Sequence, residues 1–163
     1  MAAVNIHASC VMLSEAARIF GGAPGDGILI LGPSGAGKSS VALKLLGLGA
    51  RLVADDRVEL FAREDVLWAR APAALAGLIE ARSVGIVTLK HAPEARVALA
   101  VELASPAERL PERLDYTPPA PLPVRAKPPL LRLSPQDIAV AEKIVLAAAA
   151  HANALFRHES NPP

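Results

Sequence analysis

A glycine-rich segment of the chain, residues 32–39, has the residue types and spacing that hold a phosphate chain. It reads Gly-Pro-Ser-Gly-Ala-Gly-Lys-Ser and completes the pattern G-x-x-x-x-G-K-[ST]. Backbone N–H groups of such a loop surround phosphate oxygens, and its glycines permit a close approach that side chains would block. Lys38 is predicted to reach the β- and γ-phosphates, and the Ser39 hydroxyl is predicted to bind Mg²⁺. The predicted nucleotide-binding residues are Gly32, Pro33, Ser34, Gly35, Ala36, Gly37, Lys38, Ser39 and Ser40.

Two adjacent carboxylates follow the next apolar run of the chain. Residues 52–54 are Leu-Val-Ala, and Asp55 and Asp56 come directly after them. An acid at the end of a strand that follows a phosphate loop commonly meets Mg²⁺ or its water. A turn after the strand could present both acids, so that one holds the metal while the other takes a proton from an attacking hydroxyl. The alternative is a solvated turn, which the phosphate loop one helix earlier disfavours.

A third candidate is the pair Glu80 and Arg82. Residues two apart on a strand face the same side, so this carboxylate could complete a metal shell while the guanidinium clamps phosphoryl oxygens. The alternative is a surface ion pair that contributes little to stability. The two preceding motifs favour the functional interpretation.

The elements around these residues are typical of an α/β fold. The apolar run 27–31 predicts a strand before the loop, and residues 41–46 predict a helix after it that ends near Gly49. Strand, glycine loop and helix in this order also disfavour a chance glycine turn. Further strands are predicted at 4–13, 50–54, 58–61, 66–69, 85–89 and 95–103, with a hairpin turn at 63–65 and a helical turn or two within 72–78.

The C-terminal third combines a proline-rich segment with a predicted helix. Residues 106–135 contain nine of the fifteen prolines, which favours extended or irregular backbone because each proline lacks an N–H donor. A helix over about 135–157 is predicted, with Ser134 as its N-cap. Its apolar stripe is expected to pack on the sheet and comprises Ile138, Ala141, Val145, Ala148 and Ala152.

Composition narrows the class of protein. A chain of 163 residues is long enough for one domain, and 3% aromatic residues mean that aliphatic side chains must build its core. The net charge of +1 gives no indication of nucleic acid or of an anionic membrane as partner. Cys10, the only cysteine, excludes an intramolecular disulfide and is expected to be a small buried residue. No secretory signal or membrane span is recognisable, so a cytoplasmic location is expected.

Taken together, these residues resemble the HPr kinase/phosphorylase family. The similarity rests on the loop G-P-S-G-A-G-K-S, on L-V-A-D-D-R-V at 52–58, and on E-A-R followed by G-I-V within 80–87. It implies ATP-dependent phosphorylation of a serine on HPr, the carrier protein of the sugar phosphotransferase system, with Mg²⁺ as cofactor, and the reverse reaction with inorganic phosphate. It further implies a single P-loop kinase domain over 1–163, a mixed sheet similar to the nucleotide domain of phosphoenolpyruvate carboxykinase, and a homo-oligomer, namely a hexamer.

The resemblance also assigns roles to individual residues. Asp55 matches the aspartate that takes the proton of the target serine and returns it in the reverse reaction. Arg109 matches a later active-site arginine, a position for which Arg113 competes. His7 matches a histidine near the phosphates, and an ordinary polar strand residue is the alternative at that position. The expected catalytic residues are Asp55, Lys38, Arg82, Arg109 and His7, and the expected metal ligands are Ser39, Glu80 and Asp56.

The chain departs from the family pattern at several positions. Ser40 replaces an acidic residue, Ser83 replaces a glycine, and no G-R-N motif is found near the C-terminus. The chain is similar to the compact proteobacterial form, without the N-terminal domain of longer members. Two alternatives therefore stay open. One is a small-molecule kinase that shares the phosphate loop, although the usual arginine-rich lid is not evident, and the other is a regulatory module that binds ATP without turnover.

Overall fold

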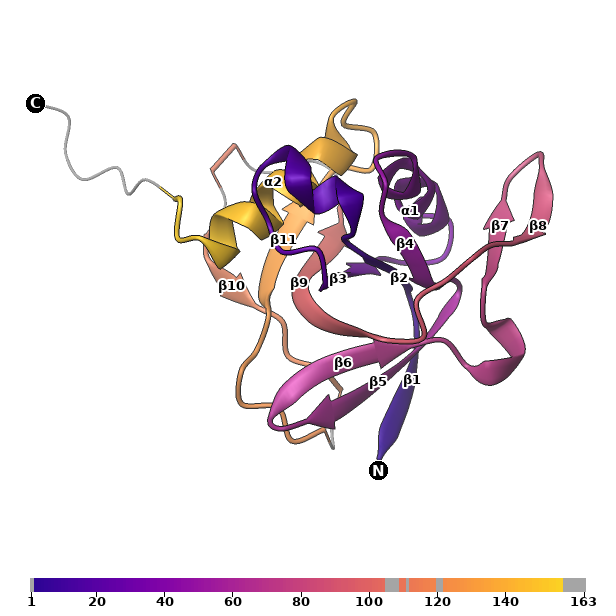
Figure 1. The fold of residues 1–163 in the computed structure, drawn as a ribbon, viewed down its shortest axis with the longest axis horizontal. Coiled ribbons are helices and arrows are strands. Elements are labelled where there is room, and N and C mark those ends of the chain that lie inside the picture. Colours follow the sequence, from indigo (N-terminus) through magenta and orange to yellow (C-terminus); the bar gives the residue numbers. More distant parts are fainter. Residues whose placement is uncertain (1, 105–108, 111, 120–121, 157–163) are drawn as a thin grey trace, which may run out of the picture.

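The computed structural model describes residues 2–104, 109–110, 112–119 and 122–156, in which two helices cover one face of a curled, mixed sheet (Figure 1). The strands are β1 (Ala3–His7), β2 (Ser9–Met12), β3 (Asp26–Leu31), β4 (Arg51–Ala54), β5 (Arg57–Arg63), β6 (Val66–Arg70), β7 (Leu78–Ala81), β8 (Gly85–Thr88), β9 (Ala95–Leu103), β10 (Leu114–Asp115) and β11 (Pro129–Leu133). The helices are α1 (Lys38–Gly47) and α2 (Val140–Ala152), and the short 3₁₀ helices are η1 (Glu15–Ile19) and η2 (Ala73–Leu75). This arrangement confirms the predicted α/β class with a mixed sheet.

Strand β9 joins the parts of the main sheet. The strand order is β1-β5-β6-β9-β3-β2-β4. One edge of β9 pairs with β6 near its start and with β11 farther along, and β11 in turn pairs with β10. β3 and β11 run parallel to β9, whereas β2, β5 and β6 pair antiparallel with their neighbours. The carboxyl end of β3 therefore lies in the middle of the sheet, where the phosphate loop begins.

Alternating side chains along the central strands create two cores, one on each face of the sheet. Ile28 and Ile30 of β3 pack with the helices, whereas Leu29 packs on the opposite face. On β2 the same alternation places Val11 among the helices and Cys10 among the residues of the β5–β6 side. Cys10 is buried as predicted, and burial raises the pKa of its thiol to about 12.

The predicted strand over 4–13 was wrong in one respect, because the structure divides it in two. β1 pairs with β5, and β2 lies between β3 and β4. The break falls at Ala8, whose N–H donates to the carbonyl of Asp56 at 3.3 Å. His7 and Ser9 therefore lie on either side of a step in the sheet, next to the turn that carries the two acids.

Helix α1 follows the prediction, whereas α2 begins later and ends earlier than predicted. Gly49 has the left-handed φ of 99° that stops α1. The N-cap of α2 is Ala139 and not the predicted Ser134, and the Asp137 carboxylate accepts the N–H of Ala139 at 2.9 Å, a local bond that competes with helix formation in the preceding residues. Ile138 is 94% exposed and Ala152 is exposed as well, so neither belongs to the packed stripe, whereas the predicted Ala141, Val145 and Ala148 are buried. Residue 157 of the predicted helix lies outside the described residues.

The proline-rich segment is extended or irregular where the structure describes it, as predicted. It contains β10 and β11, and β11 adds to the main sheet through Leu130 to Leu133 beside β9. Its residues 106–108, 111 and 120–121 lie outside the described residues.

Two hairpins flank the central strands. Glu64 and Asp65 join β5 and β6 with φ angles of 51° and 63°, the signature of a tight two-residue turn at the predicted position. Among the described residues, β7 and β8 pair with each other and with no other strand, and they project from the body of the molecule (Figure 1). The turn of this second hairpin contains Ser83 with a φ of 68°, a conformation that favours glycine. In the part of the chain that the structure describes, no helix is long and apolar enough to pass through a bilayer.

Candidate active site

The phosphate loop connects β3 to α1 and has the backbone shape that its glycines predict. Gly35 and Gly37 have φ angles of 80° and 98°, which side chains with a Cβ rarely adopt. Gly37 directly precedes α1, and the N–H of Val41 bonds to its carbonyl at 2.9 Å. A Cβ at Gly35 would meet no heavy atom within 4 Å, so this part of the loop faces open space. The helix N-terminus and the loop N–H groups together form a site suited to an anion.

Lys38 lies folded over the loop. Its ammonium donates to the carbonyls of Gly32 and Pro33 at 2.8 and 2.9 Å. The side chain is largely buried, and this burial lowers the Lys38 pKa, while the negative charges of Asp55 and Asp56 act in the opposite direction. The ammonium is thus positioned at the loop itself, where a bound polyphosphate would meet it.

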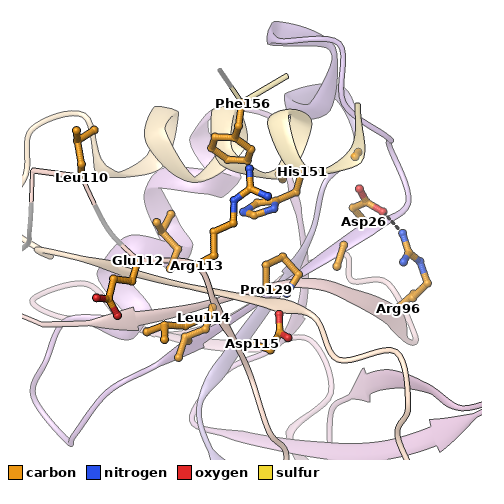
Figure 2. A pocket seen from close by; sticks show the side chains of 15 residues that line it. Asp26, Arg96, Leu110, Glu112, Arg113, Leu114, Asp115, Pro129, His151 and Phe156 are labelled. Carbon is orange, nitrogen blue, oxygen red and sulfur yellow. Dashed lines mark hydrogen bonds and ion pairs between the residues drawn. The ribbon is translucent and has the colours of Figure 1, made fainter. Parts of the chain in front are cut away.

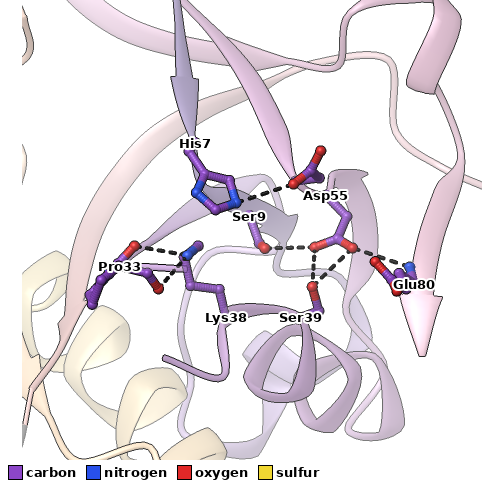
Figure 3. Close-up of polar contacts among 9 residues, drawn as sticks. His7, Ser9, Pro33, Lys38, Ser39, Asp55 and Glu80 are labelled. Atoms are coloured by element: carbon purple, nitrogen blue, oxygen red, sulfur yellow. Dashed lines mark hydrogen bonds and ion pairs between the residues drawn. The ribbon is translucent and has the colours of Figure 1, made fainter. Parts of the chain in front are cut away.

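Asp55 is the centre of the polar contacts in Figure 3. It is 3% exposed and follows the last residue of β4. The Ser9 hydroxyl donates to Asp55 Oδ1 at 2.7 Å, and the Ser39 hydroxyl contacts Oδ1 and Oδ2 at 2.8 and 3.0 Å. The backbone N–H of Glu80 donates to Oδ2 at 3.2 Å. Three elements far apart in the sequence therefore converge on one carboxylate.

Asp56 takes no part in these hydrogen bonds and pairs with His7. The distance from His7 Nε2 to Asp56 Oδ1 is 3.1 Å, and the two side chains are 37% and 66% exposed. Asp56 has a φ of 67°, so the chain turns sharply between the two acids. This turn gives the acids different surroundings, because Asp55 is buried and Asp56 is open to solvent.

Glu80 and Arg82 come to the same place from the β7–β8 hairpin. Glu80 is on β7, but the strand ends at Ala81, so the predicted pairing of two residues on one strand face was wrong for Arg82. Both residues nevertheless line the cleft beside the phosphate loop, and both are exposed. The hairpin brings an acid and a guanidinium to the open side of the site.

A cleft of about 300 Å³ unites most of the predicted site residues. It is lined by His7, Ser9, Ser34, Gly35, Gly37, Lys38, Ser39, Ser40, Asp55, Asp56, Glu80 and Arg82. Gly32, Pro33 and Ala36 belong to the loop but are not among the lining residues. Arg109 is exposed and is not among them either.

The oxygen atoms that Ser39, Glu80 and Asp56 bring to this cleft are of the type that Mg²⁺ binds. Mg²⁺ takes one or two protein oxygens and completes its shell with water and substrate phosphates. Among the described residues there is no cluster of three or more histidine, cysteine or acidic side chains that could enclose a metal. The Ser39 hydroxyl, Glu80 and Asp56 line the same cleft, so the expected metal ligands lie together at its open side, next to Asp55.

Ser9 is the site residue that sequence reasoning missed. It lies in the buried stretch Ala8–Val11, and only its hydroxyl distinguishes it from apolar neighbours. The contact with Asp55 depends on the pairing of β2 with β4, in which Cys10 lies opposite Ala54. A polar residue inside an otherwise apolar strand was the one available signal.

A second, larger cavity of about 880 Å³ lies between α2 and the β10–β11 branch, and Asp26 at the start of β3 also lines it (Figure 2). It contains Arg113, whose guanidinium lies 5.5 Å from the Phe156 ring. Asp26 and Arg96 also line this cavity and form an ion pair at 2.6 Å. The competing arginine of the sequence prediction thus lines this cavity and not the cleft beside the phosphate loop.

Comparison with known proteins finds both similar sequences and a similar fold. The family model described as the HPr Serine kinase C-terminal domain matches residues 17–115. HPr kinase/phosphorylases of Streptococcus pneumoniae strains Hungary19A-6 and 70585 are 52% identical over 64 residues, or 39% of this chain. The chain spans only 21% of the length of these curated relatives. A solved structure of the Hpr(Ser) kinase/phosphatase from Coxiella burnetii superposes on this chain with a TM-score of 0.67 at 21% sequence identity. The superposition covers 88% of this chain and 94% of the Coxiella chain, which shows a common fold.

Proposed function

The chain belongs to the family of the HPr serine kinase C-terminal domain, and we propose that it transfers the γ-phosphoryl group of ATP to a serine of HPr. The observation that carries this proposal is the position of Asp55. It is a carboxylate that already accepts two serine hydroxyls, and it lies in the same cleft as Lys38 and the phosphate loop.

The proposed transfer needs little covalent chemistry from the protein. The Oγ of the target serine attacks the γ-phosphorus, the bond to the bridging oxygen of ADP breaks, and Asp55 takes the hydroxyl proton. Loop N–H groups and the Lys38 ammonium stabilise the negative charge that develops on the phosphate oxygens. Arg82, on the open side of the cleft, is suited to hold the γ-phosphoryl oxygens bidentately.

Magnesium would supply, when bound, positive charge that offsets the charge of the transferred group. Ser39 would hold it with Glu80, and Asp56 is a further candidate ligand. In the reverse reaction, which is also part of the proposal, a protonated Asp55 returns its proton to the leaving serine. His7 would take part in the reaction through its contact with Asp56. A catalytic role of Arg109 stays a prediction, because Arg109 does not line the cleft.

The deciding experiment incubates the protein with ATP, Mg²⁺ and purified HPr and searches HPr for phosphoserine by mass spectrometry. The control is an HPr variant in which the modified serine is replaced by alanine. Phosphorylated HPr is the expected result. Transfer to metabolites but not to HPr would favour the small-molecule kinase, and tight ATP binding without any transfer would favour the regulatory module.

The proposal also includes the oligomeric state and the location that the family resemblance implies. The protein is a homo-oligomer, a hexamer, that works in the cytoplasm, where ATP and HPr are both available. Multi-angle light scattering of the purified protein measures its mass directly, and a monomer at micromolar concentration would contradict this part of the proposal.

A further inference from the structure

The contact between Ser9 and Asp55 has no place in the roles assigned so far. Ser9 is 1% exposed, and its hydroxyl donates to Asp55 Oδ1 at 2.7 Å, the shortest of the four contacts to that carboxylate. A hydrogen bond to an ionised group is stronger than one between neutral groups. Ser9 is therefore a tight and buried partner of the proposed proton acceptor.

The sheet fixes the position of the Ser9 hydroxyl. Ser9 lies opposite Ile30 of β3, two residues before the phosphate loop, and the next residue of β2 lies opposite Ala54 of β4. Its side chain shares a face with Val11, which packs toward the helices, so it lies on the side of the sheet where α1 begins. Two ladders thus hold this hydroxyl between the start of the loop and the end of β4.

The other two donors to Asp55 are held less firmly than Ser9. Ser39 contacts both carboxylate oxygens, but its hydroxyl is also the predicted ligand of Mg²⁺ and would turn toward the metal when the nucleotide binds. The Glu80 N–H belongs to the β7–β8 hairpin, which pairs with no other strand among the described residues. Of these three donors, Ser9 is the one that reaches Asp55 from the interior of the main sheet.

We infer that Ser9 is a positioning residue, whose hydroxyl fixes the orientation of the Asp55 carboxylate so that its other oxygen faces the open cleft when Ser39 binds the metal. This inference rests on the proposed kinase function and adds to it the residue that orders the proton acceptor. Ser9 itself remains unmodified throughout the reaction.

The test compares Ser9→Ala with Ser9→Thr, which keeps the hydroxyl. For Ser9→Ala we expect kcat for HPr phosphorylation to fall about tenfold, the effect of one lost hydrogen bond to a charged group, with KM for ATP changed less than about twofold. Ser9→Thr should recover kcat to within about threefold. Ser14→Ala is the matched control, since the Ser14 side chain makes no capping hydrogen bond and lies outside the cleft. If the alanine variant does not fold, Ser9→Cys replaces it, because a thiol has similar size but donates weakly.

A second measurement needs no activity. Urea unfolding without nucleotide, on Ser9→Ala, Asp55→Asn and the double variant, gives the coupling between the two side chains. We expect the double variant to be less destabilised than the two single variants combined, by at least about threefold in the unfolding equilibrium constant. If the wild type does not phosphorylate HPr, the proposed function fails, and this cycle still decides whether Ser9 holds Asp55.

Three outcomes would overturn the inference. The first is a Ser9→Ala enzyme with wild-type kcat, and the second is additive destabilisation in the cycle. The third is phosphate on Ser9 after incubation with ATP and Mg²⁺, because Ser9 would then be a substrate and not a positioning residue.

Discussion

Replacement of Asp55 by asparagine tests the reasoning about the site most directly. The substitution keeps the shape of the side chain and removes its charge and its capacity to take a proton. The new amide would retain one oxygen, which can still accept the Glu80 N–H that donates to Asp55 at 3.2 Å. The hydroxyls of Ser9 and Ser39 can rotate and accept from the amide NH₂, because a hydroxyl both donates and accepts.

The structure allows the two effects of this substitution to be estimated separately. Neutral hydrogen bonds replace charge-assisted ones, and the Ser9 hydroxyl hydrogen loses its acceptor when the Ser9 oxygen accepts from the amide, so we expect a loss of about 1–2 kcal/mol in unfolding free energy. For a chain of this size that corresponds to a fall of about 2–8 °C in Tm. Transfer to HPr should fall about 10²- to 10⁴-fold, the contribution of a positioned general base. ATP affinity should change little, since Lys38 and the loop remain.

The assay follows phosphoserine on HPr by mass spectrometry and ATP binding by titration calorimetry on the same preparations. Asp65→Asn is the matched control, because Asp65 lies in the β5–β6 turn with a φ of 63°, a conformation that asparagine readily adopts. An Asp55→Asn enzyme that retains a third or more of wild-type transfer would refute Asp55 as the proton acceptor. Loss of ATP binding together with activity would instead make Asp55 a residue that holds the metal–nucleotide complex.

Three further predictions concern single residues. Lys38→Ala should weaken ATP binding about 10- to 100-fold and slow transfer, because a charged donor to the phosphates is lost, and unchanged calorimetric affinity would remove the loop assignment. Ser83→Gly should raise the unfolding free energy by about 0.5–1 kcal/mol in a denaturant titration, since glycine adopts the φ of 68° at this turn without steric cost, whereas a lower stability would contradict the argument. Cys10, with its thiol pKa raised to about 12 by burial, stays protonated at about pH 8 and should react with a thiol reagent such as dithionitrobenzoate only after unfolding, so rapid reaction of the folded protein would be incompatible with the structure.

Short-range patterns predicted the core of the site. The phosphate loop, its strand and its helix lie within residues 26–47, so their arrangement follows from local sequence. Asp55 and Asp56 follow β4, which the chain reaches directly after the turn at Gly49. Elements so close in sequence leave few ways of arranging their side chains, which is why the cleft contains the acids that the sequence indicated.

Long-range pairings explain what the sequence did not predict. Ser9 approaches Asp55 only because β2 is inserted between β3 and β4, a register that no local pattern of residues 4–13 reveals. The division of that segment at Ala8 depends on a hydrogen bond to Asp56, which is 48 residues later in the chain. Arg109 and Arg113 were assigned by similarity alone, and the structure places neither in the cleft.

The helix α2 shows how a local competitor shifts a boundary. Ser134 and the proline after it are good helix starters, but Asp137 supplies a carboxylate that captures the N–H of Ala139 and delays the first turn. Both signals are visible in the sequence, and only the geometry of the chain arriving from β11 decides between them.

The shared strand β9 has a consequence for how the domain loses its structure. Its two edges carry hydrogen bonds to β3, β6 and β11, so the layer under the helices and the layer around β5 cannot separate without breaking the same nine-residue strand. Heating should therefore melt the two layers in a single cooperative transition, with coincident circular dichroism and calorimetric midpoints. Amide protons in β9 should exchange only through global opening, which makes this strand the slowest-exchanging part of the sheet.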